Sequence, residues 1–326
     1  MTEQLKLEEA VGRLVKAEDV LLLCHKNPDG DTIGSAGALF WALKALGKQA
    51  AVLCADGIPD RYSYMQITPF EGQFTPRYVV AVDVASIQLF GDSIRDYTRQ
   101  IDLCIDHHSS NAGYALETLL DAGAAATAEI LYRLIPTMGV HLTPKIADCL
   151  YTGLSTDTGC FRFSNTTANS HQVAAGLIGS GARLEELNTI LFESKSRERI
   201  EAERIALDQL EYHFDGRCAL IYLTREQIAE SGVKPDELEN MTSLPRMIEG
   251  VQVGLTLRQQ PGGSYKISVR TQEGVDACAI AQRLGGGGHS RAAGCELEGN
   301  LCNTKAAILA EVERELAAAD KDRQQA

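Results

Sequence analysis

Short apolar segments that alternate with helical patterns constrain the fold of this chain more than any other feature. Four β-branched or leucine-rich runs occupy residues 20–24, 50–54, 78–82 and 101–105. A helical pattern at 32–46, which ends at Gly47, separates the first two runs. Strands that alternate with helices are typical of a parallel sheet covered on both faces. The sequence therefore predicts an α/β domain with a doubly wound, mainly parallel sheet.

Side chains of the types that commonly bind metals come directly after three of these runs. The runs are followed by His25-Lys26-Asn27-Pro28-Asp29-Gly30-Asp31, by Asp83 and by Asp106-His107-His108. The carboxyl ends of parallel strands lie along one edge of a sheet, where ligands bind in α/β proteins. We expect these side chains to converge there. We count Asp157, which follows a predicted helix at 143–154, among the residues at strand ends.

A structural alternative exists for the first loop. Asp31 is a suitable N-cap for the helix that follows, and His25 would then be a solvated loop residue. This alternative explains one loop but not the polar side chains that follow two other predicted strands.

The expected cluster combines three imidazoles with five carboxylates. Carboxylates at close range repel one another, so some of them stay protonated unless cations neutralise them. Imidazole nitrogens and carboxylate oxygens suit divalent ions of the manganese or zinc kind. Two such ions would nearly balance the negative charge of the carboxylates. Sites with two metal ions catalyse displacement reactions at phosphorus. The cluster therefore predicts hydrolysis of a phosphate ester.

Charge and cysteine usage limit the partners of the chain. A net charge of −13 disfavours adhesion to long nucleic acid or to anionic membranes, since such binding depends on clustered lysine and arginine. The nine cysteines are scattered without a Cys-x-x-Cys pair, which indicates reduced core residues. The first residues do not have the regions of a signal peptide, and no apolar run is long enough to cross a bilayer. We expect a cytoplasmic protein.

The second half of the chain predicts a separate domain. A charge-dense segment at 193–210 is expected to form a helical connector. Strand-like runs follow at 218–222, 251–257 and 265–270, with helices at 275–284 and 304–319. This pattern predicts a second, smaller α/β domain. We place the boundaries at 1–185 for the first domain, 186–211 for the connector and 212–326 for the second domain.

Two further segments carry candidate ligand-binding residues. Residues 285–288 are four glycines, followed by His289 and Arg291. Such a run is typical of a flexible turn, but it can also present backbone N–H groups to a phosphate. Arg270, at the end of a predicted strand, would join this site or be a surface arginine. Residues 161–165, which follow Asp157, are Phe-Arg-Phe-Ser-Asn and could line a ligand.

Taken in order, these motifs resemble those of the DHH phosphoesterase superfamily. The match comprises His25-x-x-x-Asp29-x-Asp31, Asp83, Asp106-His107-His108 and Asp157. The segment Gly285-Gly286-Gly287-Gly288-His289-x-x-Ala292-Ala293-Gly294 resembles the glycine-rich motif of the DHH-associated C-terminal domain. The resemblance spans nearly the whole chain.

The resemblance implies a role for each candidate residue. One ion, usually manganese in this superfamily, would be held by His25 and Asp29. The other ion would be held by Asp31, His107 and Asp157, with Asp83 bridging the two. His108 would contact the scissile phosphate or its water, and Asp106 would orient an imidazole. The terminal phosphate of the substrate would be bound by Gly286, Gly287, Gly288, His289, Arg291 and Arg270.

The domain arrangement resembles that of stand-alone nanoRNases that also dephosphorylate 3′-phosphoadenosine 5′-phosphate. It implies hydrolysis of very short oligoribonucleotides to mononucleotides and removal of the 3′-phosphate from that nucleoside bisphosphate. The resemblance is also compatible with a homodimer. An alternative with the same chemistry is cleavage of linear dinucleotides derived from cyclic dinucleotide signals. A pyrophosphatase has a different C-terminal motif, a long-strand exonuclease needs a basic channel, and the complete ligand set argues against a non-catalytic nucleotide-binding module.

Overall fold

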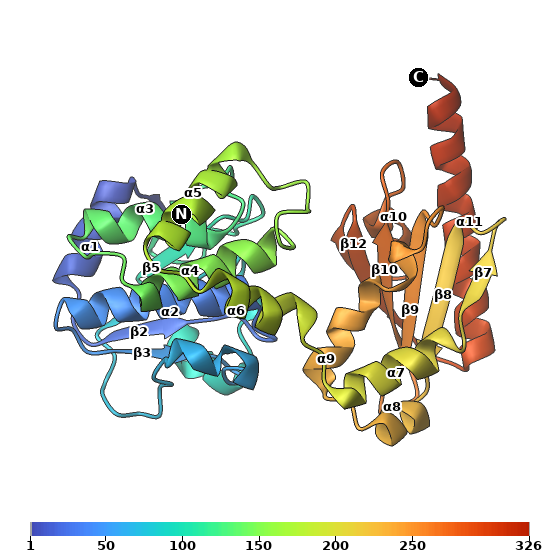
Figure 1. Ribbon diagram of the computed structural model, residues 1–326, viewed down its shortest axis with the longest axis horizontal. Coiled ribbons are helices and arrows are strands. Elements are labelled where there is room, and N and C mark those ends of the chain that lie inside the picture. The colour runs from blue at the N-terminus through green and yellow to red at the C-terminus, as the bar shows by residue number, and fades with distance from the viewer. Residues whose placement is uncertain (1, 326) are drawn as a thin grey trace. The chain divides into compact units, whose positions relative to one another are not determined.

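The chain forms two compact units, Met1–Ser194 and Lys195–Ala326 (Figure 1). The computed structural model describes residues 2–325, apart from the side chains of residues 236, 239, 240, 289 and 322–325. The division between the units falls inside the segment predicted as the connector, whose limits stay a prediction. Among the described residues, no helix combines the length and the apolar character that a membrane span requires.

The first unit is built on a six-stranded sheet in which every pair of neighbours is parallel. The strands in spatial order are β1 (Glu3–Gln4), β6 (Glu117–Leu120), β5 (Leu103–Asp106), β4 (Tyr78–Val82), β2 (Val20–Leu23) and β3 (Ala50–Leu53). All four residues of β2 are fully buried, which explains its continuous apolar sequence, because a central parallel strand is covered on both faces. The predicted parallel α/β sheet is confirmed.

Helices cover one face of this sheet, and short turns cover the other. The helices are α1 (Leu7–Lys16), α2 (Gly30–Ala45), α3 (Thr127–Thr137), α4 (Pro144–Asp157), α5 (Ala168–Gly179) and α6 (Leu184–Asn188). The main core lies between these helices and the sheet. The opposite core includes residues from the 3-10 segments η2 (Ile87–Leu89) and η3 (Asp92–Thr98) or next to them, while η1 (Asp60–Met65) joins the helical side.

Small residues bring α2 and α4 close together. A β-carbon at Gly34 would collide with the carbonyl oxygen of Cys149, and one at Gly153 would lie 2.5 Å from Oδ1 of Asp31. The two glycines therefore set the separation of the helices. Gly153 also fixes the space in which the carboxylate of Asp31 sits.

The structure corrects the placement of Asp157 and adds two strands. Asp157 ends helix α4 rather than a strand, because α4 continues past the predicted end. In the last turn of α4, the hydroxyl of Thr156 donates a hydrogen bond to the carbonyl oxygen of Thr152, so this polar side chain is accommodated within the helix. The strands β1 and β6 were not predicted, since β1 has two residues and β6 combines Glu117 and Thr118 with only two leucines.

The second unit has a mixed six-stranded sheet, which confirms the predicted smaller α/β domain. Its strands in spatial order are β11 (Gly287–His289), β12 (Ala292–Leu297), β10 (Tyr265–Thr271), β9 (Val253–Gln259), β8 (Cys218–Leu223) and β7 (Glu211–His213). Only β8 and β9 are parallel. The long helix α11 (Leu301–Gln325) packs on the sheet through Ile308, Val312 and Leu316, which recur every fourth residue (Figure 1).

Shorter elements complete the chain. Between α6 and β7 lie the π-helical turn η4 (Thr189–Glu193) and helix α7 (Arg197–Leu207). The second unit also contains α8 (Arg225–Ser231), α9 (Pro235–Glu239), η5 (Asn240–Ser243), η6 (Pro245–Met247) and α10 (Ala277–Gln282). The strands β11 and β12 were missed in the sequence because glycine and alanine are poor strand formers.

Candidate metal centre

The side chains predicted to converge in the first unit lie together in the structure. Their ligand atoms form three overlapping groups, in each of which all atoms lie within 4.8 Å of one another. The groups are His25 with Asp29 and Asp83, Asp31 with His107 and Asp157, and Asp83 with His107 and His108. Asp106 joins the cluster through a hydrogen bond of 2.7 Å from Nδ1 of His108 to its Oδ1.

The start of helix α2 places the first pair of ligands. Asp29 is the N-cap, and its Oδ1 accepts hydrogen bonds from the backbone N–H groups of Asp31 and Thr32 at 3.0 and 3.1 Å. The same oxygen lies 3.6 Å from Nε2 of His25, whose side chain is 16% exposed. The alternative in which Asp31 caps the helix and His25 is solvated is therefore wrong.

Asp31 is fully buried and is held at the N-terminus of α3. Its Oδ2 accepts from the backbone N–H of Thr127 at 2.6 Å, and its Oδ1 accepts from the N–H of Ala128 and the hydroxyl of Ser35. A helix N-terminus favours a carboxylate. Burial and the neighbouring charge of Asp83 nevertheless raise the pKa of Asp31 to about 8. Without cations, the carboxylates of the cluster therefore cannot all be ionised at neutral pH.

Asp83 lies at the centre of the cluster in a strained backbone conformation. Its φ is +61°, which is uncommon for a residue other than glycine and is typical of functional sites. Oδ1 accepts a hydrogen bond of 2.8 Å from the hydroxyl of Thr127 and lies 3.6 Å from Nε2 of His107. Burial and the charge of Asp29 raise the pKa of Asp83 to about 8. This position between the groups suits a bridging carboxylate.

Two imidazoles are oriented by backbone carbonyl groups. Nδ1 of His107 lies 3.2 Å from the carbonyl oxygen of Ala124, and Nδ1 of His25 lies 2.8 Å from that of Lys26. A proton on Nδ1 leaves Nε2 with a free lone pair, which is the form that binds a metal. Nε2 of His107 is buried and has no hydrogen-bond partner among the described residues.

The distances around this unpartnered nitrogen fit a divalent cation. Nε2 of His107 lies 3.4 Å from Oδ2 of Asp157 and 3.6 Å from Oδ1 of Asp83. These separations are too long for strong hydrogen bonds. They match two ligands of one ion, since bonds of about 2.1 Å place neighbouring ligands roughly 3 to 3.5 Å apart. The residues present therefore form a candidate site for divalent metal ions.

Asp106 is in none of the three groups of candidate metal ligands, and it instead forms a hydrogen bond with His108. It is fully buried, and its oxygens accept from the backbone N–H of His107 at 2.9 Å, Nδ1 of His108 at 2.7 Å and the amide of Asn111 at 2.6 Å. Burial opposes the ionisation of Asp106, but these hydrogen bonds outweigh it, so its pKa lies below the usual value. The hydrogen bond with Asp106 raises the pKa of His108 to about 9, which keeps this imidazole positively charged at neutral pH.

The candidate substrate-binding residues lie in the second unit. The N–H groups of Gly285 and Gly286 are used internally, because they donate to the carbonyl oxygens of Gln282 and Ala281 at the end of α10. Gly287 and Gly288 belong to β11, an edge strand with alternate N–H groups facing away from β12. Arg270 lies one residue before the end of β10, where it pairs with Ala292 of β12.

Two further candidates complete this set. Arg291 is exposed in the turn between β11 and β12. The side chain of His289 lies outside the described residues. The substrate-binding role of all these residues stays a prediction.

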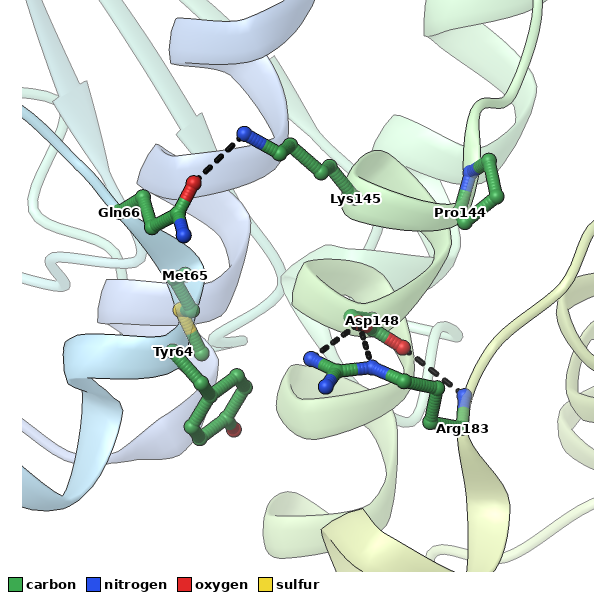
Figure 2. Close-up of a pocket in the computed structure, with 7 residues that line it drawn as sticks. All are labelled: Tyr64, Met65, Gln66, Pro144, Lys145, Asp148 and Arg183. Atoms are coloured by element: carbon green, nitrogen blue, oxygen red, sulfur yellow. Dashed lines mark hydrogen bonds and ion pairs between the residues drawn. The ribbon is translucent and has the colours of Figure 1, made fainter.

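A separate hollow of about 310 Å³ near the start of α4 is not part of this centre. Figure 2 shows that its charged groups are already paired: Arg183 binds Asp148 and Lys145 binds Gln66. The Asp148 carboxylate is buried and is held by both the backbone and the side chain of Arg183. These groups have a structural role, and the hollow contains no cluster like that at the sheet edge.

The supporting residues of the metal centre were missed in the sequence. Ser35, Asn111 and Thr127 hold the carboxylates, yet none of them stands in a motif. Ser35 lies four residues after Asp31 on α2, and that helical spacing is the one signal that could have identified it.

Comparisons with known proteins agree with this architecture. A model of the DHH family, N-terminal domain, matches residues 19–154, and a model of the DHHA1 domain matches residues 217–318. A curated relative from Thermus thermophilus is 34% identical over 307 residues, which cover 91% of this chain and 89% of the relative. The chain belongs to the DHH family, and it combines the N-terminal domain of that family with a DHHA1 domain.

The relatives carry a more specific name. The Thermus thermophilus protein is the bifunctional oligoribonuclease and PAP phosphatase NrnA. A protein of the same name from Bacillus subtilis is 24% identical, over 86% of this chain and 90% of its own length. The crystal structure of an exopolyphosphatase-related protein from Bacteroides fragilis matches with a TM-score of 0.87 at 22% identity, covering 96% of this chain and 97% of its own, which supports the fold.

Proposed function

We propose that this protein is a manganese-dependent phosphoesterase. Its substrates would be very short oligoribonucleotides, released as mononucleotides, and 3′-phosphoadenosine 5′-phosphate, from which it would remove the 3′-phosphate. The unpartnered Nε2 of His107 between the carboxylates of Asp83 and Asp157 carries the proposal, because this arrangement suits a cation. The similarity along nearly the whole chain to the Thermus thermophilus enzyme supports the substrates.

We assign the metal ligands according to the groups in the cluster. His25 and Asp29 would hold one ion, with Asp83 shared between both sites. Asp31, His107 and Asp157 would hold the other ion. Bound divalent ions would supply the charge that polarises the phosphate and lowers the pKa of water. The mixed nitrogen and oxygen ligands suit manganese.

The residues around the ions would orient the reaction. His108, whose pKa Asp106 raises to about 9 in the metal-free protein, can donate a hydrogen bond to a phosphate oxygen or to the leaving oxygen. Asp106 fixes the ring through Nδ1, which leaves Nε2 of His108 as the donor toward substrate. This pair resembles other arrangements in which a buried carboxylate orients a histidine that transfers a proton.

The glycine-rich segment of the second unit would bind the far end of the substrate. A β-carbon at Gly286 would collide with β12, and Gly288 has a φ of +144° with Ala292 and Ala293 packed against it. Gly287 differs, since a β-carbon there would meet nothing within 4 Å. A glycine that the fold does not require suggests that a ligand approaches the backbone closely. The exposed Arg291 and the nearby Arg270 would add positive charge for a terminal phosphate.

The cysteines support a cytoplasmic location. All nine are free thiols, and six of them are buried within the two units. Free thiols in this number are typical of a reducing compartment.

The test uses the purified full chain with RNA dinucleotides, 3′-phosphoadenosine 5′-phosphate and a linear 5′-phosphorylated dinucleotide. We expect turnover of the first two with Mn²⁺ and none after chelation. His107→Ala should lose metal-dependent turnover, whereas His141→Ala, a histidine outside the cluster, should retain it. Turnover of the phosphorylated dinucleotide alone would favour the alternative in cyclic dinucleotide signalling. No hydrolysis of any of the three would contradict the proposal.

A further inference from the structure

The turn at residues 159–163, directly after the candidate ligand Asp157, presents an aromatic ring that the fold does not use. All eight phenylalanines of the chain are described, and Phe163 is the one among them that is exposed, with 50% of its surface accessible. An isolated exposed apolar residue is ordinary in a protein surface. Here, however, the ring stands on a rigid turn beside the metal centre, which calls for a functional explanation.

The backbone of this turn is strained and tightly held. Residues 159–161 all have φ between +56° and +60°, and two of them are not glycine. The N–H of Cys160 donates to the carbonyl oxygen of Ser155 at 2.6 Å, and that of Phe163 donates to Thr158 at 3.0 Å. A strained conformation persists where the surrounding structure enforces it, and such segments cluster at ligand-binding sites.

The two phenylalanines of the turn have different environments. Phe161 packs toward the core, with its ring stacked on His171 at 5.1 Å and 26°, and close to Tyr151. Phe163 lies over Gly159, where a β-carbon would overlap the ring. Gly159 therefore provides the flat support on which the ring of Phe163 rests. Half of the surface of Phe163 remains accessible, so the ring can accept another planar group.

A positive charge accompanies this ring. The Nε of Arg162 donates to the carbonyl oxygen of Gly159 at 2.7 Å, which fixes the base of an exposed guanidinium group. No carboxylate forms an ion pair with Arg162 among the residues whose side chains are described. In a chain with a net charge of −13, an anchored arginine without an acidic partner is available for an anionic ligand.

Asn165, which follows the turn, connects it to two segments of the metal centre. The amide of Asn165 donates to the carbonyl oxygens of Asp157 and Ala125 at 3.1 and 3.0 Å, and Ala124 orients His107. Gly159, on which the ring of Phe163 rests, is two residues from Asp157, so their Cα atoms are at most about 7.6 Å apart. The aromatic ring is therefore anchored on a residue close in the chain to the candidate ligand Asp157.

We infer that residues 159–163 form a nucleoside subsite. Phe163 stacks on the base of the nucleotide whose phosphate lies at the metal centre, and Arg162 contacts the negative charge of the same nucleotide. Every base has a π-face, so stacking on one phenylalanine accepts all four bases, as a degradative enzyme requires. This subsite rests on the proposed function, because it concerns the substrate of the same centre.

The test compares Phe163→Leu and Phe163→Trp in the full-length protein with Mn²⁺. The substrates are a 5′-phosphorylated adenylate dinucleotide and two analogues, each abasic at one of the two positions. We expect Phe163→Leu to raise KM for the intact dinucleotide by about 5- to 100-fold with little change in kcat. The variant should not raise KM for the analogue that is abasic at the position read by Phe163. Phe163→Trp should restore the wild-type KM, and Tyr212→Leu, which removes an aromatic side chain that is 55% exposed, should have no effect.

Arg162→Gln tests the charge independently of the ring. It should raise KM for the intact substrate and both abasic analogues alike, and should reduce the dependence of KM on salt concentration. Unchanged salt dependence would contradict the role of Arg162.

Two results would overturn the stacking role. One is a Phe163→Leu variant with wild-type KM. The other is a wild-type protein that shows equal KM for the intact dinucleotide and both abasic analogues, a result that does not depend on the folding of any variant. Failure of the proposed function is distinguishable, since neither the unphosphorylated RNA dinucleotide nor 3′-phosphoadenosine 5′-phosphate would then be hydrolysed. In that case calorimetric binding of adenosine 5′-monophosphate to wild type and to Phe163→Leu still decides whether the ring binds a nucleoside.

Discussion

Gly153 on helix α4 lies against the carboxylate of Asp31 on helix α2, at a distance that leaves no room for a β-carbon. Such a carbon would be 2.5 Å from Oδ1 of Asp31 and 2.9 Å from Cβ of Ala128. The packing of two helices and the position of a candidate metal ligand therefore depend on the same residue.

We expect Gly153→Ala to displace Asp31 and to weaken Mn²⁺ binding by about tenfold or more, with a destabilisation of about 1–3 kcal/mol from overpacking. Calorimetric titration with Mn²⁺ and urea unfolding measure the two effects. Gly179→Ala is the matched control, because a β-carbon there meets nothing within 4 Å. Equal Mn²⁺ affinity in both variants would show that Asp31 is not constrained by Gly153.

A second prediction concerns the support of His108. Asp106→Asn removes the negative charge next to Nδ1, so the pKa of His108 should fall from about 9 toward its ordinary value of 6.5. NMR titration of the metal-free protein measures this pKa. We expect kcat to fall by about 10- to 100-fold, since general acid catalysis contributes on this scale. Asp121→Asn, which changes a partly exposed carboxylate paired with Arg133, serves as the control. If the titration of His108 is the same in Asp106→Asn and wild type, the proposed orientation is wrong.

A third prediction follows from the raised pKa values of the carboxylates. Burial and neighbouring carboxylates raise the pKa of Asp31, Asp83 and Asp157 from 3.8 to about 8. A group with a raised pKa holds its proton more tightly in the folded state, so its contribution to stability is complete below pH 3.8 and is lost as the pH rises through 8.

The imidazole of His25 also makes the stability of the folded protein fall as the pH rises, over part of the same pH range. Burial opposes the charged form of His25, but Asp29 outweighs it and raises the pKa from 6.5 to about 9. The stabilisation from His25 is therefore also lost as the pH rises from 6.5 through 9. The Tm of the metal-free protein should fall between pH 6.5 and 9 in differential scanning calorimetry, and saturating Mn²⁺ should largely remove this fall. A metal-free Tm that rises across this range would refute the charge assignment.

A fourth prediction tests the glycine-rich strand of the second unit. Gly287→Ala should leave the fold intact, because the position has open space, but should raise KM for substrates with a terminal phosphate about tenfold if the backbone binds that phosphate. Gly262→Ala is the control, since it also meets nothing within 4 Å and lies in the β9–β10 turn. Steady-state kinetics with phosphorylated and unphosphorylated dinucleotides separate the two cases. The same KM for both glycine variants would argue against phosphate binding at Gly287.

The strand ends were predictable from sequence because each carries a recognisable pattern. The buried run of β4 and the Asp83 that follows it are adjacent in the chain, so the side chain has to emerge at the sheet edge. The same holds for His107 after β5. Since every neighbouring pair in the sheet is parallel, these local patterns were sufficient to predict a common site.

The supports of these ligands could not be predicted in the same way. Thr127 donates to Asp83 from 44 residues away, and its backbone N–H binds Asp31 across 96 residues. The carbonyl oxygen of Ala124 that orients His107 belongs to a residue whose side chain has no polar group. Contacts made by the backbone leave no trace in residue type, so they emerge only when the fold is known.

The double role of Asp29 has a consequence for how the first unit assembles. One carboxylate both begins helix α2 and stands among the candidate ligands, so ordering of the first helical turn and capture of a cation are coupled equilibria. The amide hydrogens of Asp31 and Thr32, which donate to that carboxylate, should then exchange with solvent more slowly when the ion is present. Two backbone protons thus provide an intrinsic reporter of occupancy.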